Sequence, residues 1–259
     1  ALDPERGELV FMRRTPGLFD YTLYTSRQID GEWTEPVPLP FSGQWRDGGP
    51  SFAPDGSALL FDSRRPADGL EADSINVWRA ARSKQGWETP ELVRGASAGP
   101  SSEDGDQADE FGPIEDAGGA IRFYSFRRPD RGGRHYVLEP GAERAQHEDS
   151  MPDPSADTFV GYATLSADGE LAVIEGRAPG RRDTDLFLYR RNLRGVWGDA
   201  IELPMVNTRW GEGTPSLTAD GATLVFASDR PTGDERAATS NLYAIDVTAL
   251  TRPGGPGDR

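Results

Sequence analysis

Short apolar runs alternate along the chain with polar turns, and many of these turns contain Asp-Gly. An apolar segment that ends at Asp-Gly and continues into a run such as Ala58–Phe61 predicts a β-hairpin, because glycine readily adopts the backbone conformation of a tight turn. A third strand is expected after the polar loop that follows each hairpin, and a fourth strand after a Gly and a Trp. The expected third strands are residues 21–24, 75–78, 135–138, 186–189 and 242–245, and the expected fourth strands begin at Trp33, Trp87 and Trp197.

The hairpin pattern recurs as an internal repeat. Segment 50–66 aligns without a gap with segment 215–231, and both contain Pro-Ser, Asp-Gly and a closing Arg-Pro. The same frame fits 113–129 and 163–179, and an incomplete copy at 4–16 lacks its innermost strand. The closing prolines stand at positions 16, 66, 129, 179 and 231, so the steps are 50, 63, 50 and 52 residues. Five repeat units are therefore expected.

Four antiparallel strands in each unit of about 50 residues are typical of the blades of a β-propeller. We therefore expect an all-β fold with almost no helix, a five-bladed β-propeller of four-stranded antiparallel blades. The propeller is expected to be a single domain over residues 1–250, followed by a flexible C-terminal tail at 251–259, which shows no strand pattern. The polar stretch 95–109 explains the longest step and is expected to be a mobile loop.

The repeated cassette also carries a family resemblance. Residues 50–65, which read Pro-Ser-Phe-x-Pro-Asp-Gly-x-x-Leu-Leu-Phe-x-Ser-x-Arg, resemble the TolB-type, WD40-like propeller repeat. Gly-x-Trp-x-x-Pro, followed by Glu-x-x-Pro-Ser, is similar to the version attached to bacterial outer-membrane proteins. The resemblance covers residues 4 to about 248 and implies a bacterial protein of the periplasm or the cell exterior. It is weak for function, because this repeat serves binding scaffolds, peptidase gates and polysaccharide-degrading enzymes.

Composition excludes several classes of function. The charge of 28 − 43 = −15 argues against a phosphate-binding surface, so no nucleic acid partner is expected. No segment approaches the roughly 18 to 20 consecutive apolar residues of a membrane span. The absence of Cys and the presence of only His135 and His147 argue against thiolate and histidine metal sites, so no metal and no cofactor are expected. The chain shows no signal segment, which fits a cytosolic protein or a mature form whose export signal has been removed.

Equivalent positions of the repeat carry acidic and aromatic residues. Asp47, Glu110 and Glu212 stand three positions before the aligned start of the inner strand, with Val160 in the remaining unit and Asp157 nearby. Because inner strands run along the channel of a propeller, these carboxylates are expected at one channel mouth, flanked by Trp45 and Trp210. Aromatic rings beside carboxylates suit sugar or cationic ligands. The alternative is that the acid and the Trp belong to the packing between blades.

Two further repeated features favour structural roles. Arginines precede the closing prolines, and a guanidinium there could bridge blades by forked bonding to a neighbouring carboxylate or to a strand-end carbonyl, with recurring aspartates to serve as the carboxylate. If these arginines instead point into the channel, the site would suit a carboxylate ligand. Aspartates before the third strands are expected to form turns. The arginines are Arg14, Arg64, Arg65, Arg127, Arg128, Arg177 and Arg230, the recurring aspartates are Asp55, Asp168 and Asp220, and the turn aspartates are Asp20, Asp73, Asp183 and Asp185.

Catalytic motifs are weak. Gly95-Ala-Ser-Ala-Gly99 matches the Gly-x-Ser-x-Gly pattern of a nucleophile elbow, but Ser97 is not placed between a strand and a helix. The preferred function is a non-catalytic binding module in the bacterial envelope, monomeric, with a protein or carbohydrate ligand at one channel face. The alternative is a glycoside hydrolase or lyase acting on polysaccharide through the channel-mouth carboxylates. An acidic interaction platform for a basic envelope protein is a third possibility.

Overall fold

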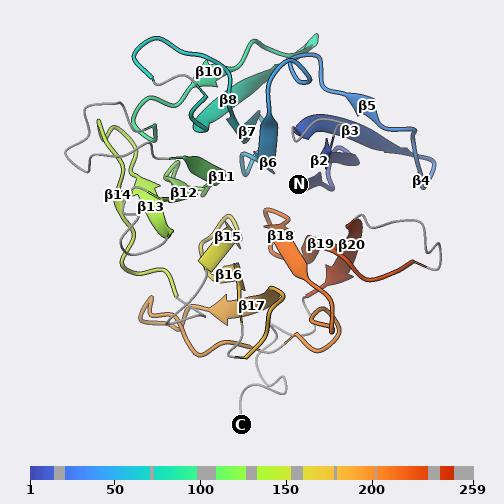
Figure 1. Cartoon of the computed structure of the whole chain (residues 1–259), viewed down its shortest axis with the longest axis vertical. Coiled ribbons are helices and arrows are strands. Elements are labelled where there is room, and N and C mark those ends of the chain that lie inside the picture. The colour runs from blue at the N-terminus through green and yellow to red at the C-terminus, as the bar shows by residue number, and fades with distance from the viewer. Residues whose placement is uncertain are drawn as a thin grey trace. The chain divides into compact units, whose positions relative to one another are not determined.

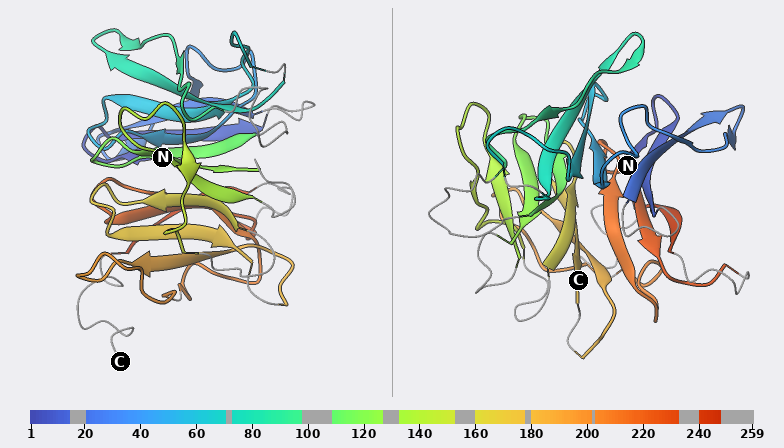
Figure 2. Two further views of the ribbon diagram at one scale, coloured as in Figure 1. Left: turned by 90° about the vertical axis from the view of Figure 1, so that its left-hand side faces the viewer. Right: turned by 45° about the horizontal axis from the view of Figure 1, so that its top comes forward.

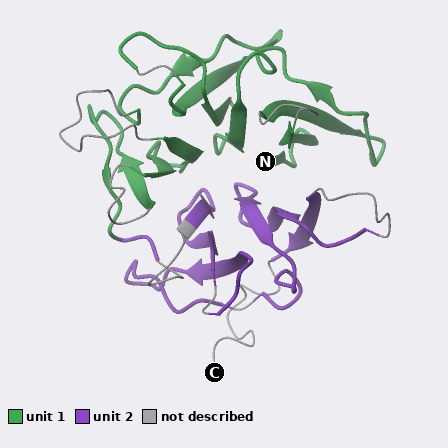
Figure 3. Cartoon of the chain, in the orientation of Figure 1, with its two compact units in different colours: residues 1–149 green, residues 150–259 purple. Residues whose placement is uncertain are grey.

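The computed structural model describes nine stretches of the chain, and within them lie twenty strands and no helix. The predicted all-β class is therefore confirmed. The chain divides into two compact units, residues 1–149 and 150–259, which Figure 3 shows in different colours. The expected tail at 251–259 and most of the expected mobile loop, at 98–108, lie outside the described residues. The described ranges are 1–14, 21–70, 73–97, 109–126, 133–152, 160–177, 180–201, 203–232 and 240–247.

Unit 1 contains three antiparallel sheets, labelled in Figure 1. The first has the order β1-β2-β3-β4, with β5 also paired to β3, and comprises β1 (Leu2–Asp3), β2 (Glu8–Arg14), β3 (Tyr21–Ile29), β4 (Glu32–Trp33) and β5 (Val37–Pro38). The second has the order β10-β8-β7-β6, with β9 also paired to β8, and comprises β6 (Asp47–Phe52), β7 (Ala58–Ser63), β8 (Asn76–Ser83), β9 (Gly86–Trp87) and β10 (Glu91–Leu92). The third has the order β11-β12-β13-β14 and comprises β11 (Glu110–Glu115), β12 (Ile121–Ser125), β13 (Arg134–Leu138) and β14 (Gln146–His147).

Unit 2 contains two antiparallel sheets of three strands each, seen from two further sides in Figure 2. The fourth sheet comprises β15 (Val160–Leu165), β16 (Leu171–Gly176) and β17 (Asp185–Arg190), and the fifth comprises β18 (Glu212–Leu217), β19 (Thr223–Ser228) and β20 (Asn241–Asp246). Two isolated bridges, Leu188 to Ile201 and Arg191 to Trp197, stand where a fourth strand was expected in the fourth sheet. The five sheets are the blades of the predicted five-bladed β-propeller.

Three details of the sequence prediction were wrong. The first repeat does not lack its innermost strand, because β1 pairs with β2 through Leu2 and Leu9. The predicted fourth strand is broken in two in the first two sheets, since Pro36 and Pro90 stand between its halves and proline has no N–H to donate. The hairpin of the third repeat is also one residue shorter than that of the second. Ser125 therefore matches Ser63, whereas the gap-free alignment places Phe126 there.

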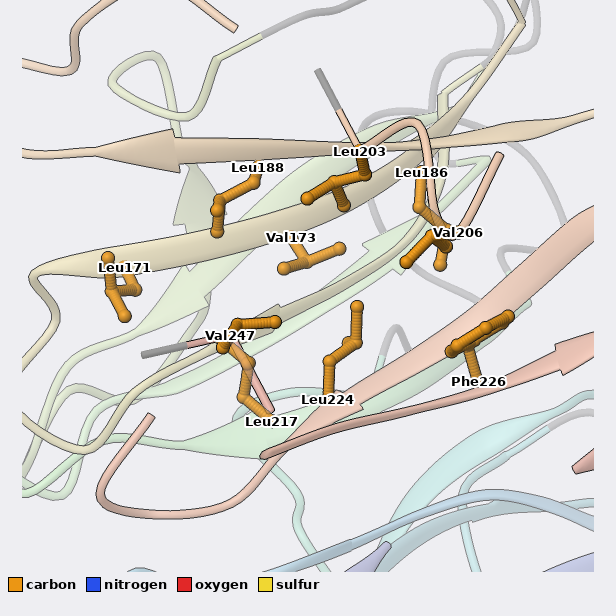
Figure 4. Close-up of a cluster of buried hydrophobic side chains, with 10 residues drawn as sticks. All are labelled: Leu171, Val173, Leu186, Leu188, Leu203, Val206, Leu217, Leu224, Phe226 and Val247. Atoms are coloured by element: carbon orange, nitrogen blue, oxygen red, sulfur yellow. The ribbon is translucent and has the colours of Figure 1, made fainter. Parts of the chain in front are cut away.

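The core of each unit lies between neighbouring sheets. In unit 1, alternate residues of β7 face opposite ways: Leu59 and Phe61 pack with Val10 of the first sheet, whereas Leu60 packs with Phe123 of the third. A strand covered on both faces is apolar at almost every position, which explains the continuous run at 58–61. In unit 2 the two sheets enclose one apolar cluster, drawn in Figure 4, in which β16, β17 and β19 contribute side chains.

Candidate functional site

The first predicted carboxylate, Asp47, is fully buried at the start of β6 and is held by three side chains. Its Oδ1 accepts hydrogen bonds from Ser63 Oγ at 2.6 Å and from Arg65 Nη2 at 2.9 Å. Its Oδ2 accepts one from Ser42 Oγ at 2.6 Å. Asp47 therefore joins three parts of unit 1: the loop 39–46 that leads into β6, the end of β7, and the segment after β7.

Arg65 completes this anchor and lies in a cage of aromatic rings. Its Nε donates to Ser63 Oγ at 3.1 Å, and its Nη2 also donates to the carbonyl oxygen of Phe41 at 3.2 Å. The guanidinium carbon lies 5.4 Å from the ring centre of Trp45 and within 6 Å of three further rings. These rings belong to Phe41, Phe61 and Trp78. The half-buried Trp45 is thus one wall of the cage around a buried cation.

Unit 2 repeats the anchor around Glu212, at the start of β18. Glu212 is fully buried, and its Oε1 accepts hydrogen bonds from Thr208 Oγ1 at 2.7 Å, Ser228 Oγ at 2.9 Å and Arg230 Nη2 at 3.3 Å. Its Oε2 accepts one from the backbone N–H of Thr208 at 3.0 Å. Arg230 Nη2 also donates to the carbonyl oxygen of Val206, as Arg65 does to that of Phe41. The loop 203–211 is therefore fixed in the same way as the loop 39–46.

Each loop is also tied to the sheet that precedes it. Leu23 N–H donates to Ser42 Oγ at 2.9 Å, and in unit 2 Leu186 N–H donates to Asn207 Oδ1 at 2.9 Å. Asn207 Nδ2 returns a hydrogen bond of 2.8 Å to the Leu186 carbonyl oxygen. Each loop is consequently bonded both to the preceding sheet and to the inner strand that follows, and these bonds fix the positions of its residues.

Glu110, the third predicted carboxylate, is fully buried at the start of β11, next to β6 in unit 1. Its N–H donates to the carbonyl oxygen of Ile75 at 2.9 Å, and it faces Ser125 across the β11–β12 ladder. Arg127, which corresponds to Arg65, lies outside the described residues, as do Arg128 and Asp157. The structure thus places Asp47 and Glu110 at the starts of neighbouring strands in unit 1, and Glu212 at the corresponding place in unit 2.

The two predicted tryptophans differ in their surroundings. Trp45 covers Arg65, whereas Trp210 is 37% exposed and has the guanidinium of Arg209 at 4.9 Å from its ring centre. The Trp210 backbone is nevertheless fixed, because its N–H donates to Thr208 Oγ1 at 3.1 Å. Met205, on the same loop, is 73% exposed. The loop 203–211 therefore presents two apolar side chains to solvent from an anchored backbone.

The forked bonding predicted for the arginines occurs at Arg65 and Arg230, each of which bonds to a carboxylate and a carbonyl oxygen, but the recurring aspartates are not the carboxylates involved. Asp55 and Asp220 instead accept backbone N–H bonds inside their own hairpin turns, at 2.9 Å from Ser57 and 3.0 Å from Ala222. Hydrogen bonds from the hydroxyls of Ser57 and Thr218, together with these backbone bonds, hold the pKa of both carboxyls below its usual range. Asp168 accepts the corresponding bond from Glu170 N–H at 3.0 Å. All three residues are turn caps.

The aspartates expected in turns before the third strands divide into several cases. Asp73 has a positive φ of 67°, as expected of a turn residue. Asp185, in contrast, is the first residue of β17, is buried, and has its Oδ2 3.2 Å from Arg181 Nε. Asp183 immediately precedes Thr184, whose carbonyl oxygen accepts the N–H of Glu212 at 2.9 Å. Asp20 lies outside the described residues.

Sequence reasoning missed Glu175, near the end of β16. Glu175 is 9% exposed, and its Oε2 accepts a hydrogen bond of 2.9 Å from the N–H of Thr214 on β18. Burial raises the pKa of Glu175 to about 7, and the Thr214 N–H opposes that rise only in part. Asp62 holds the corresponding position on β7. Two acids at one buried position of the repeat were the signal in the sequence.

The remaining candidates have structural surroundings. His135 is buried against the edge of the Tyr124 ring, and burial lowers its pKa to about 4, so it is neutral. His147 lies in β14 and contacts Asp149 Oδ1 at 2.7 Å on the surface. Ser97 Oγ donates to the Val93 carbonyl oxygen at 3.2 Å in a turn after β10. Within the described residues, no three acidic or histidine side chains gather as metal ligands would, and no helix could cross a membrane.

Comparison by sequence finds no match to a known protein family and none to a curated protein. Among solved structures, TolB from Acinetobacter baumannii is similar over 94% of this chain and 50% of its own, with 16% identity and a TM-score of 0.51. A Hadza microbial sialidase matches over 94% of this chain and 64% of its own, with 12% identity and a TM-score of 0.49. An oligogalacturonate lyase in complex with manganese matches over 87% and 54%, with 20% identity and a TM-score of 0.43.

The chain therefore spans about half the length of the TolB structure that it matches. Likeness at such low identity establishes the fold and leaves the activity open. The repeat units, the five antiparallel sheets and this comparison agree: the chain is a five-bladed β-propeller whose fold is similar to that of TolB.

Proposed function

We propose that the protein is a non-catalytic binding module of the bacterial envelope, periplasmic or extracellular. In this proposal the ligand, a protein or a carbohydrate, contacts the loops that lead into the inner strands. Trp210 and Trp45 lie on those loops, and Asp47, Glu110 and Glu212 stand at the starts of the strands that follow them.

Trp210 is the observation that carries the proposal. An indole that is exposed on a backbone with few degrees of freedom loses little entropy on binding, and its face accepts sugar C–H groups, apolar side chains or cations. The Thr208–Glu212 anchor fixes the backbone at Trp210, and Met205 adds apolar surface on the same loop. Exposed aromatic and Met side chains on a rigid loop are typical of recognition surfaces.

The carboxylates support binding over catalysis. Asp47 and Glu212 are fully buried, and each accepts hydrogen bonds from an arginine and from hydroxyl groups. A general acid or base must reach the proton that it transfers, within hydrogen-bond distance of the substrate. Carboxylates enclosed in this way suit a different task, which is to hold the recognition loops in place.

The test compares Trp210→Ala with a control of similar exposure, Val196→Ala, whose parent side chain is also exposed in unit 2. Binding is measured on a glycan array and against purified envelope proteins, and melting temperature is measured in parallel. We expect Trp210→Ala to abolish binding with an unchanged melting temperature and Val196→Ala to leave both unchanged. Retention of full binding by Trp210→Ala, or hydrolysis or elimination of polysaccharide by the wild-type protein, would overturn the proposal.

A further inference from the structure

Two buried carboxylates, one in each unit, make the same contact with the next sheet. In unit 1, Asp62 Oδ2 accepts a hydrogen bond of 3.0 Å from the N–H of Gly112 on β11. In unit 2, Glu175 Oε2 accepts one of 2.9 Å from the N–H of Thr214 on β18. Both donors occupy the third position of an inner strand, at a β-bulge. The carboxylates are therefore equivalent members of the repeat.

Unit 1 supplies a cation to its carboxylate. Arg46 Nη1 forms an ion pair with Asp62 Oδ1, and both side chains are almost completely buried. The Arg46 guanidinium carbon lies 5.7 Å from the ring centre of Tyr21 and 5.5 Å from that of Phe111. Burial raises the pKa of Asp62, and the guanidinium of Arg46, held between aromatic rings, opposes that rise.

Among its described residues, unit 2 does not supply that cation. The position of Arg46 in the fourth repeat is taken by Phe159, an uncharged residue that lies outside the described residues. Gly213 holds in the fifth repeat the position that Phe111 holds in the third. Unit 2 therefore has no aromatic ring at this position. An added Cβ at Gly213 would meet Glu175 Oε2 at 3.0 Å, which places the carboxylate directly beneath this glycine.

No other charged group among the described residues balances Glu175. The strands packed against β16 carry two acids that already have cations, because Asp185 on β17 pairs with Arg181 and Glu212 on β18 pairs with Arg230. Arg190, at the other end of β17, lies opposite Leu171 and not opposite Glu175. Arg177, two residues beyond Glu175, does not lower the pKa of Glu175. Glu175 therefore retains a single hydrogen bond in an environment that disfavours an uncompensated charge.

We propose that Glu175 is a receptor site for a cationic side chain, Arg or Lys, of a protein ligand, which would supply the charge that Arg46 supplies to Asp62 in unit 1. This inference rests on the proposed binding function and names the chemistry of its ligand. Trp210 stands three residues before Gly213 on the same segment, and its side chain is partly exposed. The net charge of −15 would attract a basic partner.

Protonation of Glu175 provides an independent measure of occupancy. Burial raises the pKa of this carboxyl to about 7, and Arg or Lys binds the ionised form, so binding releases a proton. Affinity should consequently increase as the pH rises from about 6 to about 8.

The experiment uses three capped tripeptides, Gly-Arg-Gly, Gly-Lys-Gly and Gly-citrulline-Gly, and follows the amide resonances of Gly213 and Thr214 by NMR. Citrulline has the shape of arginine without its charge. We expect the Arg and Lys peptides to shift both resonances and the citrulline peptide to leave them unchanged. Glu175→Gln, which keeps an acceptor for the Thr214 N–H, should weaken the Arg peptide at least tenfold. Glu170→Gln, at an exposed position of the same hairpin, is the matched control and should bind as the wild type does.

The wild-type titration tests the same inference without any variant, through the rise of affinity with pH and the fall in the pKa of Glu175 when the Arg peptide is added. Unchanged Gly213 and Thr214 resonances would overturn the cation site, as would equal shifts with the citrulline peptide. Equal shifts with calcium or magnesium chloride alone would also overturn it, in favour of a metal ion. If Trp210→Ala still abolishes ligand binding in those cases, the proposed function stands without this site.

Discussion

Arg65 Nη2 lies 2.9 Å from Asp47 Oδ1, and both side chains are buried. The same pair recurs in unit 2, where Arg230 Nη2 lies 3.3 Å from Glu212 Oε1. In both places the guanidinium also donates to the carbonyl oxygen of the loop that leads into the inner strand. Asp47 and Glu212 therefore recur in the sequence because each anchors the loop before its inner strand. Among the described residues, each unit contains one such anchor.

Removal of the Arg65 guanidinium should show how much this anchor contributes to the free energy of unfolding. Arg65→Ala leaves the Asp47 charge buried without its cation, and loss of one partner of a buried pair costs about 3 to 5 kcal/mol. Arg64→Ala is the matched control, because Arg64 is the exposed neighbour in the chain and its loss should change stability by less than about 0.5 kcal/mol. Urea unfolding of both variants measures the difference, and equal stability would show that Arg65 is not part of an anchor.

The two tryptophans should respond differently to truncation. Trp45→Ala opens the cage around Arg65, and because Trp45 is only half-buried we expect a loss of about 2 kcal/mol, less than that of a core Trp. Trp210→Ala should change the free energy of unfolding by no more than about 0.5 kcal/mol. A large loss from Trp210→Ala would mean that its ring is packed and not available for a ligand.

A strained residue at the bulge of β18 offers a stabilising substitution. Thr214 has a φ of 47°, whereas the same bulge position carries Gly49 and Gly112 in unit 1. Because a β-branched residue is strained in this region, Thr214→Gly should stabilise the protein by about 1 kcal/mol. Calorimetry should show a higher melting temperature for this variant, and a clear decrease would contradict the argument.

Gly49 provides the converse test. A Cβ added at Gly49 would lie 2.3 Å from Asp62 Oδ2, in addition to the strain of its φ of 50°. Gly31 has a φ of 87° but no neighbour within 4 Å of an added Cβ. Gly31→Ala should therefore cost about 1 kcal/mol from strain alone, and Gly49→Ala should cost at least about twice as much. Equal losses in chemical denaturation would show that the bulge tolerates a side chain.

Glu175 should make stability depend on pH. Its pKa in the folded protein is raised from 4.5 to about 7, so folding favours the protonated form. The stability that this group contributes is fully present below about pH 4.5 and is lost as the pH rises through about 7, a change of about 3 kcal/mol. Glu175→Gln should remove this dependence, so that the variant gains stability relative to the wild type at about pH 8. A constant difference between the two proteins across this range would contradict the shift.

The sequence was sufficient for the hairpins and the third strands because their signals are local. Asp-Gly specifies the turn, and the runs on either side pair with their immediate neighbours in the chain, as β7 and β8 do. The fourth strands were predicted less well. Pairing around Pro36 and Pro90 depends on which N–H groups lie opposite a carbonyl of the adjacent strand. Because proline has no N–H, it divides each fourth strand into two short pieces.

The sequence by itself determined the repeat, the all-β class and the equivalence of Asp47 with Glu212 and of Trp45 with Trp210. Only the tertiary structure decided that both acids are enclosed by Ser, Thr and Arg side chains, and that one tryptophan covers a cation while the other faces solvent. It also revealed that, among the described residues, Glu175 has no counterpart of the arginine that pairs with Asp62. The physical reason is that burial and charge compensation arise from contacts between segments far apart in the chain, so two positions with the same residue can differ in both.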